Sequence, residues 1–349
     1  FMTSCGEKPL QQYKKTTTEI GFDTPFTFYA YTKSEKEFDQ YYDQFKKEIY
    51  YYHQLFDKFN NYENVNNLKT INDNAGIQPI KVDQPLIDII TLSKEYYETS
   101  NHYFDISIGN MLNVWHQYRE KGITNNQMNV DGQIPTLEEL QKAQGNSSIN
   151  DIIINNDDKT IYINNKNTKI DLGGIAKGYA IELVANKLIQ EGLTSAIING
   201  GGNVKTIGSK PNNEEWNVGI TSPDLVLTNQ IIDKVSTNQP YSFVTSGDYQ
   251  RYYIGTDKKM YHHIINPLTL FPTNQFNSIT IVTQDSGLAD MLSTTLFIAP
   301  YSEHQEIINK TKLDIGVYYI SKDQIIPQST KKDNFYLYQN ESLQKINKQ

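Results

Sequence analysis

The sequence has 349 residues, of which 38% are hydrophobic and 12% aromatic. This length predicts one large domain or two intimate ones, and the aromatic residues supply enough apolar surface for an ordinary core. The 32 basic and 40 acidic residues give a net charge of −8, which argues against nucleic acid or anionic lipid as the main partner, and no apolar run is long enough to span a bilayer.

Cys5 is the only cysteine in the sequence, which excludes internal disulfides and multi-cysteine metal centres. The small residues before Cys5 resemble the end of a bacterial lipoprotein signal, and a chance cysteine is the alternative. We therefore expect Cys5 to carry a lipid that anchors the protein to the outer face of the cell membrane, or to its periplasmic side. Residues 1–20 are expected to form the tether, with residues 6–19 flexible, and residues 21–349 the folded domain.

The aromatic stretch 24–32 predicts a strand, and Ser34 is expected to cap a helix that ends at Phe59. Apolar residues at helical spacing place one face of this helix in the core, up to and including Phe59. Hydrophobic periodicity and capping residues predict further helices over residues 68–71, 83–99, 175–190 and 285–298 and from Thr136. Strands are predicted over residues 151–155, 160–164, 195–199, 216–221, 241–245, 279–283 and 315–320. The two kinds of element are mixed, without regular βαβ repetition.

Two glycine-rich segments follow predicted strands. A strand ends at Asp171, Gly173 and Gly174 turn the chain, and the next helix has Lys177 in its first turn. The free N–H groups of such a helix start favour an anion, although a purely structural turn is an equal alternative. Three glycines at positions 200–202 form a loop that either closes a tight turn or approaches a ligand closely.

Two further segments carry polar side chains in apolar surroundings. Asp290 and Thr294 are four residues apart, and so lie on one face of a predicted helix. A carboxylate and a hydroxyl are hard oxygen ligands suited to Mg²⁺, and a solvated helix face is the alternative. His262 and His263 precede an Asn-Pro turn, where a satisfied core histidine is the more frequent role.

Six segments together resemble the signatures of the ApbE family, the bacterial FAD:protein FMN transferases. They are FDISIG (104–109), DLGGIAKGYA (171–180), NGGGN (199–203), TSGDYQRY (245–252), HIINP (263–267) and ADMLST (289–294). The resemblance implies an α+β, bilobal fold of mixed sheets and helices with FAD between the lobes. It also implies transfer of FMN from FAD to a threonine or serine hydroxyl of an acceptor protein, with release of AMP.

The resemblance assigns roles by position. Mg²⁺ would be held by the Gly174 carbonyl, Asp290 and Thr294, while Lys177 would neutralise phosphate charge and His263 would act as the base, with His262 as a weaker candidate. The residues implied to line the FAD site are Phe22, Tyr62, Ser107, Ile108, Gly109, Asp171, Lys177, Ile264 and Ser293. The acceptor implied by the family is a membrane-associated redox protein with a short flavinylation motif containing threonine or serine.

Three alternatives remain open at this point. The same site could hydrolyse FAD to FMN and AMP with water as the acceptor, as a Mg²⁺-dependent pyrophosphatase. A flavin-binding lipoprotein without turnover would need the site but not His263. A plain solute-binding lipoprotein is disfavoured because Lys177, Asp290 and Thr294 occur in one chain.

Overall fold

The computed structural model describes residues 9–221, 231–321 and 335–339. Its main sheet has eight strands, and every pair of neighbouring strands is antiparallel. In sheet order the strands are β1 (Gln11–Thr17), β2 (Phe26–Thr32), β6 (Ala196–Gly200), β7 (Asn203–Ile207), β10 (Ser242–Gly247), β13 (Phe276–Thr283), β14 (Gly316–Ser321) and β15 (Phe335–Gln339).

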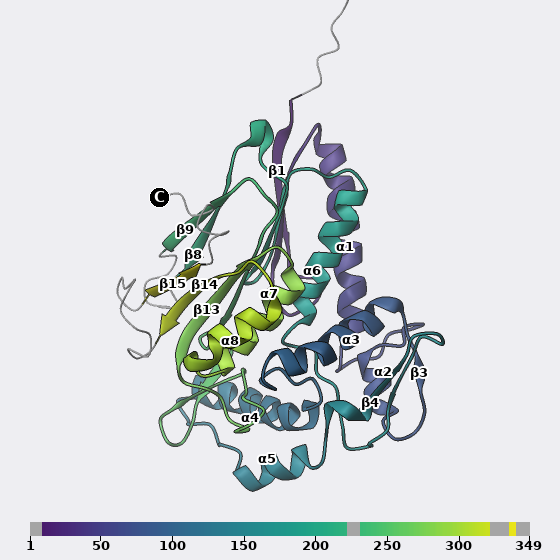
Figure 1. The fold of residues 1–349 in the computed structure, drawn as a ribbon, viewed down its shortest axis with the longest axis vertical. Coiled ribbons are helices and arrows are strands. Elements are labelled where there is room, and N and C mark those ends of the chain that lie inside the picture. The colour runs from purple at the N-terminus through teal and green to yellow at the C-terminus, as the bar shows by residue number, and fades with distance from the viewer. Residues whose placement is uncertain (1–8, 222–230, 322–334, 340–349) are drawn as a thin grey trace, which may run out of the picture.

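Helices cover one face of this sheet, as Figure 1 shows. They are α1 (Glu35–Phe56), α6 (Ala176–Gln190), α7 (Ser286–Ile298) and α8 (Tyr301–Thr311). Helix α7 is buried along almost its whole length, between α6 and strands β10 and β13. An apolar helix of this kind is the centre of a core rather than a surface element.

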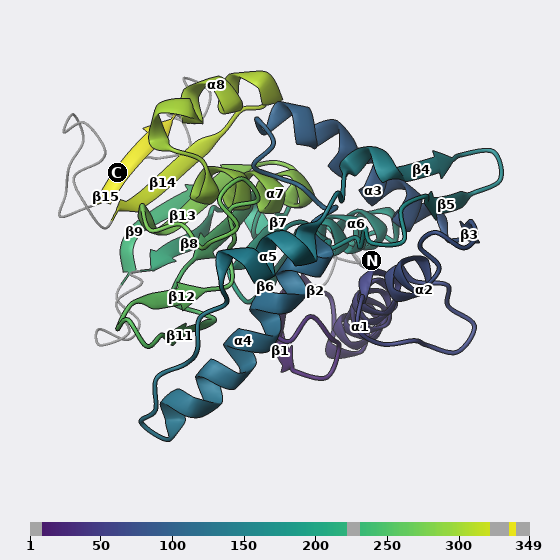
Figure 2. The same ribbon diagram turned by 90° about the horizontal axis from the view of Figure 1, so that it is seen from below.

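Most of the remaining elements form a second lobe, which lies below the main sheet in Figure 1. It contains α2 (Leu68–Asp73), α3 (Gln84–Thr99) and a small sheet of β3 (Ile80–Lys81), β5 (Thr160–Ile163) and β4 (Ile152–Asn155). It also contains α4 (Gly109–Gln127), which projects from the body in Figure 2, and α5 (Leu137–Gln144). Two strand pairs complete the fold, β8 (Trp216–Thr221) with β9 (Ile231–Thr237) and β11 (Tyr252–Ile254) with β12 (Met260–His262).

The expected flexible tether is wrong for part of its length. Residues Gln11–Thr17 form β1, which pairs with β2 from Gln11 opposite Thr32 to Thr17 opposite Phe26. Backbone hydrogen bonds make this strand, so its polar side chains do not prevent it, and lysines at the edge of a sheet oppose pairing with other chains. The folded part of the chain therefore begins before residue 21. Residues 1–8, with Cys5, lie outside the described part.

The structure confirms the predicted start of helix α1, but the helix ends earlier than predicted. The Ser34 hydroxyl accepts a hydrogen bond from the Glu37 N–H, as expected of an N-cap, but the helix ends at Phe56. Phe59 lies beyond this end and is 53% exposed rather than part of the core. Helix α4 was not predicted, since its polar sequence buries only a few residues, among them Met111 and Trp115.

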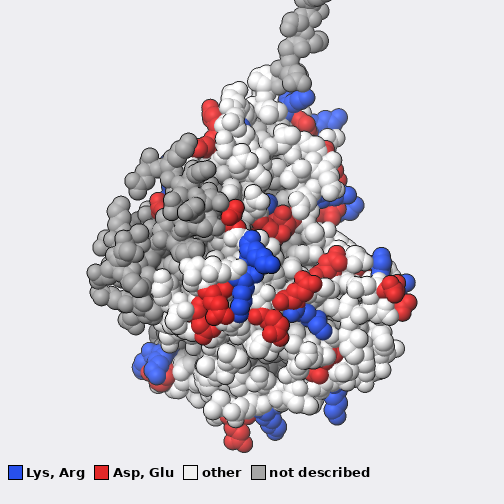
Figure 3. Space-filling view, viewed as in Figure 1, with Lys and Arg blue, Asp and Glu red and all other residues white. Residues whose placement is uncertain are grey.

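No helix in the described parts of the chain is both long and apolar enough to cross a membrane. The face shown in Figure 3 carries acidic and basic side chains interspersed, without a broad patch of one sign.

The contact between α6 and α7 depends on a missing side chain. A Cβ at Gly178 would overlap the Ser286 carbonyl oxygen and would lie only 2.5 Å from the Cβ of Asp290. The bare backbone lets the Gly178 N–H donate a 2.7 Å hydrogen bond to Oδ2 of Asp290. Gly178 does not have a positive φ, so its backbone conformation does not require glycine. Glycine is required here because the two helices approach each other closely.

We predict that Gly178→Ala lowers the free energy of unfolding by about 1–3 kcal/mol, because the new methyl group must push the two helices apart. The gain in helix propensity, about 1 kcal/mol, would offset only part of this cost. Asn186→Ala, an exposed position of the same helix, should be close to neutral. Urea unfolding of both variants measures the difference, and equal stability of Gly178→Ala and wild type would contradict the packing argument.

Candidate functional site

The two lobes enclose a cavity of about 830 Å³. Its wall is built from the turn before α6, the β6–β7 hairpin, one face of α7 and the chain around α4 and β12. Nine residues to which the family resemblance gives a role line it: Phe22, Ile108, Asp171, Gly174, Lys177, His263, Ile264, Asp290 and Thr294. Segments separated by up to 272 positions in sequence, from Phe22 to Thr294, therefore meet at one site.

A charged pair of helix residues occupies the floor of this cavity. Burial raises the pKa of Asp290 to about 6, although Lys177 and the Gly178 N–H act in the opposite direction. Burial lowers the pKa of Lys177 despite the attraction of Asp290. The Lys177 ammonium donates a 2.9 Å hydrogen bond to the Gly201 carbonyl oxygen. The site thus holds a carboxylate and an ammonium group that are both costly to bury without a charged ligand.

The glycine loop at positions 200–202 closes a tight turn, as one of its two expectations predicted, and its Gly201 lines the cavity. Gly201 and Gly202 have φ values of +54° and +92° and close the hairpin between β6 and β7. A Cβ at Gly201 would overlap the Thr24 hydroxyl. The turn can therefore bring its carbonyl to Lys177 only because no side chain is present.

Three oxygens suited to Mg²⁺ come together beside the turn before α6. Thr294 Oγ1 lies 3.5 Å from the Gly174 carbonyl oxygen, and Asp290 is one helical turn away from Thr294. The set of carboxylate, hydroxyl and carbonyl oxygen fits a hard cation. The described residues contain no group of three or more His, Cys, Asp or Glu side chains able to hold a metal. Any metal at this position would need ligands from the substrate, as is usual for Mg²⁺ on phosphates.

The neighbouring histidines have different environments. His263 lines the cavity, and its buried Nδ1 has no hydrogen-bond partner among the described residues. Burial, together with His262, Arg119 and Arg251, lowers the pKa of His263 to about 3 despite a hydrogen bond to the Arg251 backbone, so the ring is neutral near pH 7. His262 is buried, with Nε2 2.6 Å from the Thr273 carbonyl oxygen and Nδ1 accepting from the Ile264 N–H. Both nitrogens of His262 are used in the fold, which removes it as an alternative base.

Four residues that the resemblance places at the FAD site do not line the cavity. They are Tyr62, Ser107, Gly109 and Ser293. Three of them support residues that do line it, since Tyr62 donates to Asp57 at 2.6 Å, Ser107 to Asp105 at 2.6 Å and Ser293 to the Asp290 carbonyl at 2.9 Å. The Gly109 N–H bonds the Lys169 carbonyl. Sequence alone could not separate the wall of the cavity from the layer behind it.

Sequence reasoning also missed cations on the cavity wall, among them Lys58, Arg119 and Arg251. Arg251 falls inside a family-like segment, which could have drawn attention to it. Lys58 and Arg119 lie in segments without any glycine or motif signal, so only the fold could place them here. Arg119 approaches His116, with 3.0 Å between Nη2 and Nδ1.

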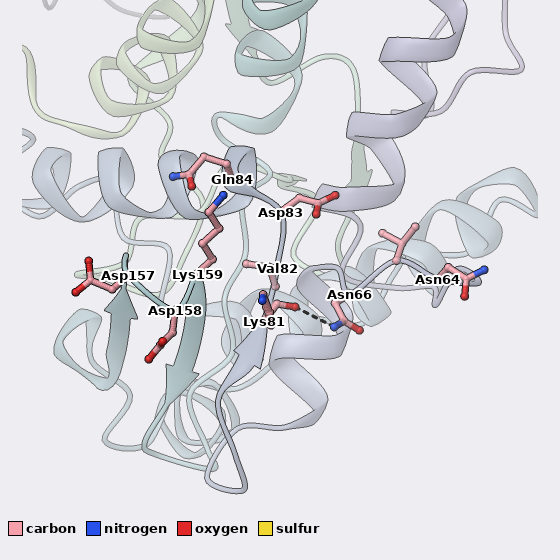
Figure 4. Close-up of a pocket in the computed structure, with 10 residues that line it drawn as sticks. Asn64, Asn66, Lys81, Val82, Asp83, Gln84, Asp157, Asp158 and Lys159 are labelled. Carbon is pink, nitrogen blue, oxygen red and sulfur yellow. Dashed lines mark hydrogen bonds between the residues drawn. The ribbon is translucent and has the colours of Figure 1, made fainter.

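A second hollow of about 800 Å³ lies at the edge of the smaller lobe, between the strand end at Lys81, the start of α3 and the β4–β5 turn. Figure 4 shows its mostly exposed side chains pointing in different directions, with one hydrogen bond, from Asn66 to the Lys81 carbonyl. It contains none of the residues singled out from the sequence. The polar groups do not converge, so the larger cavity is the candidate functional site.

The sequence model of the ApbE family matches residues 22–319. The chain therefore belongs to the ApbE family, as its motifs predicted. It is 29% identical to a FAD:protein FMN transferase of Klebsiella pneumoniae, over 65% of this chain and 66% of that protein. It is 28% identical to a FAD:protein FMN transferase of Treponema pallidum, over 68% of this chain and 66% of that protein. The matches thus span just under two thirds of the length of these curated relatives.

Solved structures agree on the fold. The ApbE protein of Thermotoga maritima superimposes with a TM-score of 0.77 at 22% identity, covering 97% of this chain and 100% of that chain. The flavin transferase ApbE of Vibrio cholerae superimposes with a TM-score of 0.74 at 20% identity, with the same coverage. The predicted α+β architecture is confirmed.

We predict that Asp290→Asn stabilises the metal-free protein at alkaline pH. Because the pKa of Asp290 is raised in the folded state, its charge opposes folding above pH 6, and this cost disappears as the pH falls toward 4. The gain in unfolding free energy should be about 1–3 kcal/mol at pH 8 and close to zero near pH 4. Urea unfolding in EDTA at both pH values measures it.

The exposed Asp43 provides the control, since Asp43→Asn should change stability by less than about 0.5 kcal/mol at either pH. An Asp290→Asn protein that is less stable than wild type at pH 8 would show that the buried carboxylate is already compensated without a metal.

Proposed function

We propose that this protein transfers FMN from FAD to a threonine or serine hydroxyl of an acceptor protein and releases AMP. The observation that carries the proposal is the convergence of Lys177, Asp290, Thr294 and His263 on one cavity of an ApbE-family chain. Two relatives named FAD:protein FMN transferase support it.

The reaction is a phosphoryl-type transfer. The acceptor oxygen attacks the phosphorus of the FMN half, the new P–O bond forms, and the bond to the bridging oxygen breaks so that this oxygen leaves with AMP. One proton must leave the acceptor hydroxyl, and negative charge on the diphosphate must be neutralised while the bonds change. Positioning and electrostatic stabilisation therefore supply most of the catalysis.

The cavity provides groups for each of these needs. Lys177 is held beside the glycine loop by its bond to Gly201 and would lie against phosphate oxygens. Gly174, Asp290 and Thr294 would hold Mg²⁺, which when bound neutralises charge on the diphosphate. The neutral ring of His263, with its free Nδ1, would receive the proton of the acceptor hydroxyl.

The acceptor we propose is a membrane-associated redox protein that carries a short threonine- or serine-containing flavinylation motif. A lipid on Cys5 would hold the enzyme on the same extracytoplasmic membrane surface as this acceptor. Confinement of both proteins to one surface raises their effective concentration without any new contact.

The test is AMP release from FAD with Mg²⁺, measured with and without a candidate acceptor, together with in-gel flavin fluorescence and the mass of the acceptor. The transferase predicts AMP and acceptor-bound flavin in equal amounts, both abolished in Asp290→Ala. AMP with free FMN and no requirement for acceptor would identify a pyrophosphatase. FAD binding without AMP, in the presence of a verified acceptor, would identify a non-catalytic flavin-binding protein.

We predict that His263→Gln lowers kcat about 10²–10⁴-fold and leaves FAD binding nearly intact, because it removes a proton acceptor but no phosphate ligand. Differential scanning fluorimetry separates this effect from unfolding. His262→Gln is the matched variant, expected to lower the melting temperature through loss of its hydrogen bonds to Thr273 and Ile264. A His263→Gln enzyme with wild-type kcat would remove His263 from the mechanism.

A further inference from the structure

Lys58 joins three distant segments at the wall of the cavity. It follows the C-terminal end of α1, and its Nζ lies 2.5 Å from Oδ2 of Asp171 and 3.1 Å from Oδ1 of Asn113 on α4. The Lys58 and Asp171 side chains are only 15% and 12% exposed. The ion pair is thus largely removed from solvent. Its effect on stability therefore depends on the geometry of its contacts more than on screening of the two charges by water and salt.

The other oxygen of Asp171 is also engaged. Oδ1 accepts a 2.7 Å hydrogen bond from the Gly173 N–H, and the Asp171 N–H donates to the Ile106 carbonyl at 2.9 Å. Asp171 therefore holds the first peptide of the glycine turn on one side and Lys58 on the other. The next residue in this turn is Gly174, whose carbonyl oxygen faces Thr294.

The charge state of Asp171 depends on this arrangement. Burial alone would raise its pKa, but the Lys58 ammonium and the Gly173 N–H outweigh burial and hold the pKa of Asp171 below its usual range. A charged carboxylate accepts a stronger hydrogen bond from the Gly173 N–H than a neutral one would. Removing Lys58 would leave a buried charge without its main partner.

We propose that Lys58 is a positioning residue for the reaction, which through Asp171 fixes the Gly173–Gly174 turn and so presents the Gly174 carbonyl oxygen to Mg²⁺. This inference rests on the proposed function and extends it to a residue outside the family-like segments. Asp171 and Asn113 take two of the three N–H donors of the Lys58 ammonium, so most of its hydrogen-bonding capacity is used within the protein.

The test compares Lys58→Met and Lys58→Arg with Lys69→Met, which removes an exposed ion pair with Asp73 on α2. Three quantities are measured: FAD affinity in EDTA from flavin fluorescence, Mn²⁺ affinity of the enzyme–FAD complex from the electron paramagnetic resonance of free Mn²⁺, and the Mg²⁺ concentration that gives half-maximal AMP release. Residues that orient metal ligands change metal affinity about 10–100-fold when replaced.

We expect Lys58→Met to weaken Mn²⁺ binding and to raise the half-maximal Mg²⁺ concentration, each by about tenfold or more, while FAD affinity in EDTA changes by less than about threefold. Lys58→Arg should recover part of the loss, and Lys69→Met should match wild type. The opposite pattern, in which FAD affinity falls without metal and Mn²⁺ affinity is unchanged, would show that Lys58 contacts the substrate and would overturn the proposal.

The double variant Lys58→Met/Asp171→Asn provides for the case in which the single variant fails to fold. It removes the unpaired buried charge, so we expect the melting temperature to recover while Mn²⁺ affinity stays low. Wild-type Mn²⁺ affinity in this folded double variant would overturn the proposal. Absence of Mg²⁺-dependent AMP release from the wild type in the presence of a verified acceptor would instead contradict the proposed function itself.

Discussion

The site depends above all on the close approach of α6 and α7 at Gly178. With no side chain between the helices, a backbone N–H of α6 reaches the Asp290 carboxylate of α7, and this contact fixes the carboxylate one turn from Thr294. The same packing sets the start of α6, and hence the position of Lys177 and of the turn that carries Gly174. A helix interface made for close packing therefore also determines where charge can be held.

The charges in the cavity are arranged at a cost to stability. Burial raises the pKa of Asp290 and lowers that of Lys177, so burial opposes the charged form of each group in the absence of a ligand. A bound cation and an anionic substrate would reverse both effects, because each supplies the opposite charge in a site of low dielectric. The free energy lost in folding such a site would be recovered when substrate and metal bind together.

The sequence predicts those parts of this protein in which local signals are strong. Ser34 caps its helix as expected, and Gly173, Gly174 and Gly201 of the two predicted glycine segments line the cavity. Prediction fails where the cause is long-range. The polar strand β1 exists because β2 offers a free edge, and Lys58 reaches the cavity only because α1 ends beside Asp171.

The difference between the cavity wall and the layer behind it is the least predictable feature. Ser293 and Thr294 are adjacent in sequence, yet the helix turns one hydroxyl toward Ser246 and the other toward the Gly174 carbonyl. A motif therefore identifies a segment but cannot assign a role to each of its residues. Side-chain direction, which depends on tertiary packing, decides which of them meets the substrate.

The most direct test of this account is a crystal structure of the wild-type protein soaked with FAD and Mn²⁺, with anomalous scattering used to locate the metal. The account predicts one strong anomalous peak within coordination distance of Asp290, Thr294 and the Gly174 carbonyl oxygen, with the diphosphate beside Lys177. A peak elsewhere in the cavity, or FAD bound with its diphosphate away from Lys177, would contradict it.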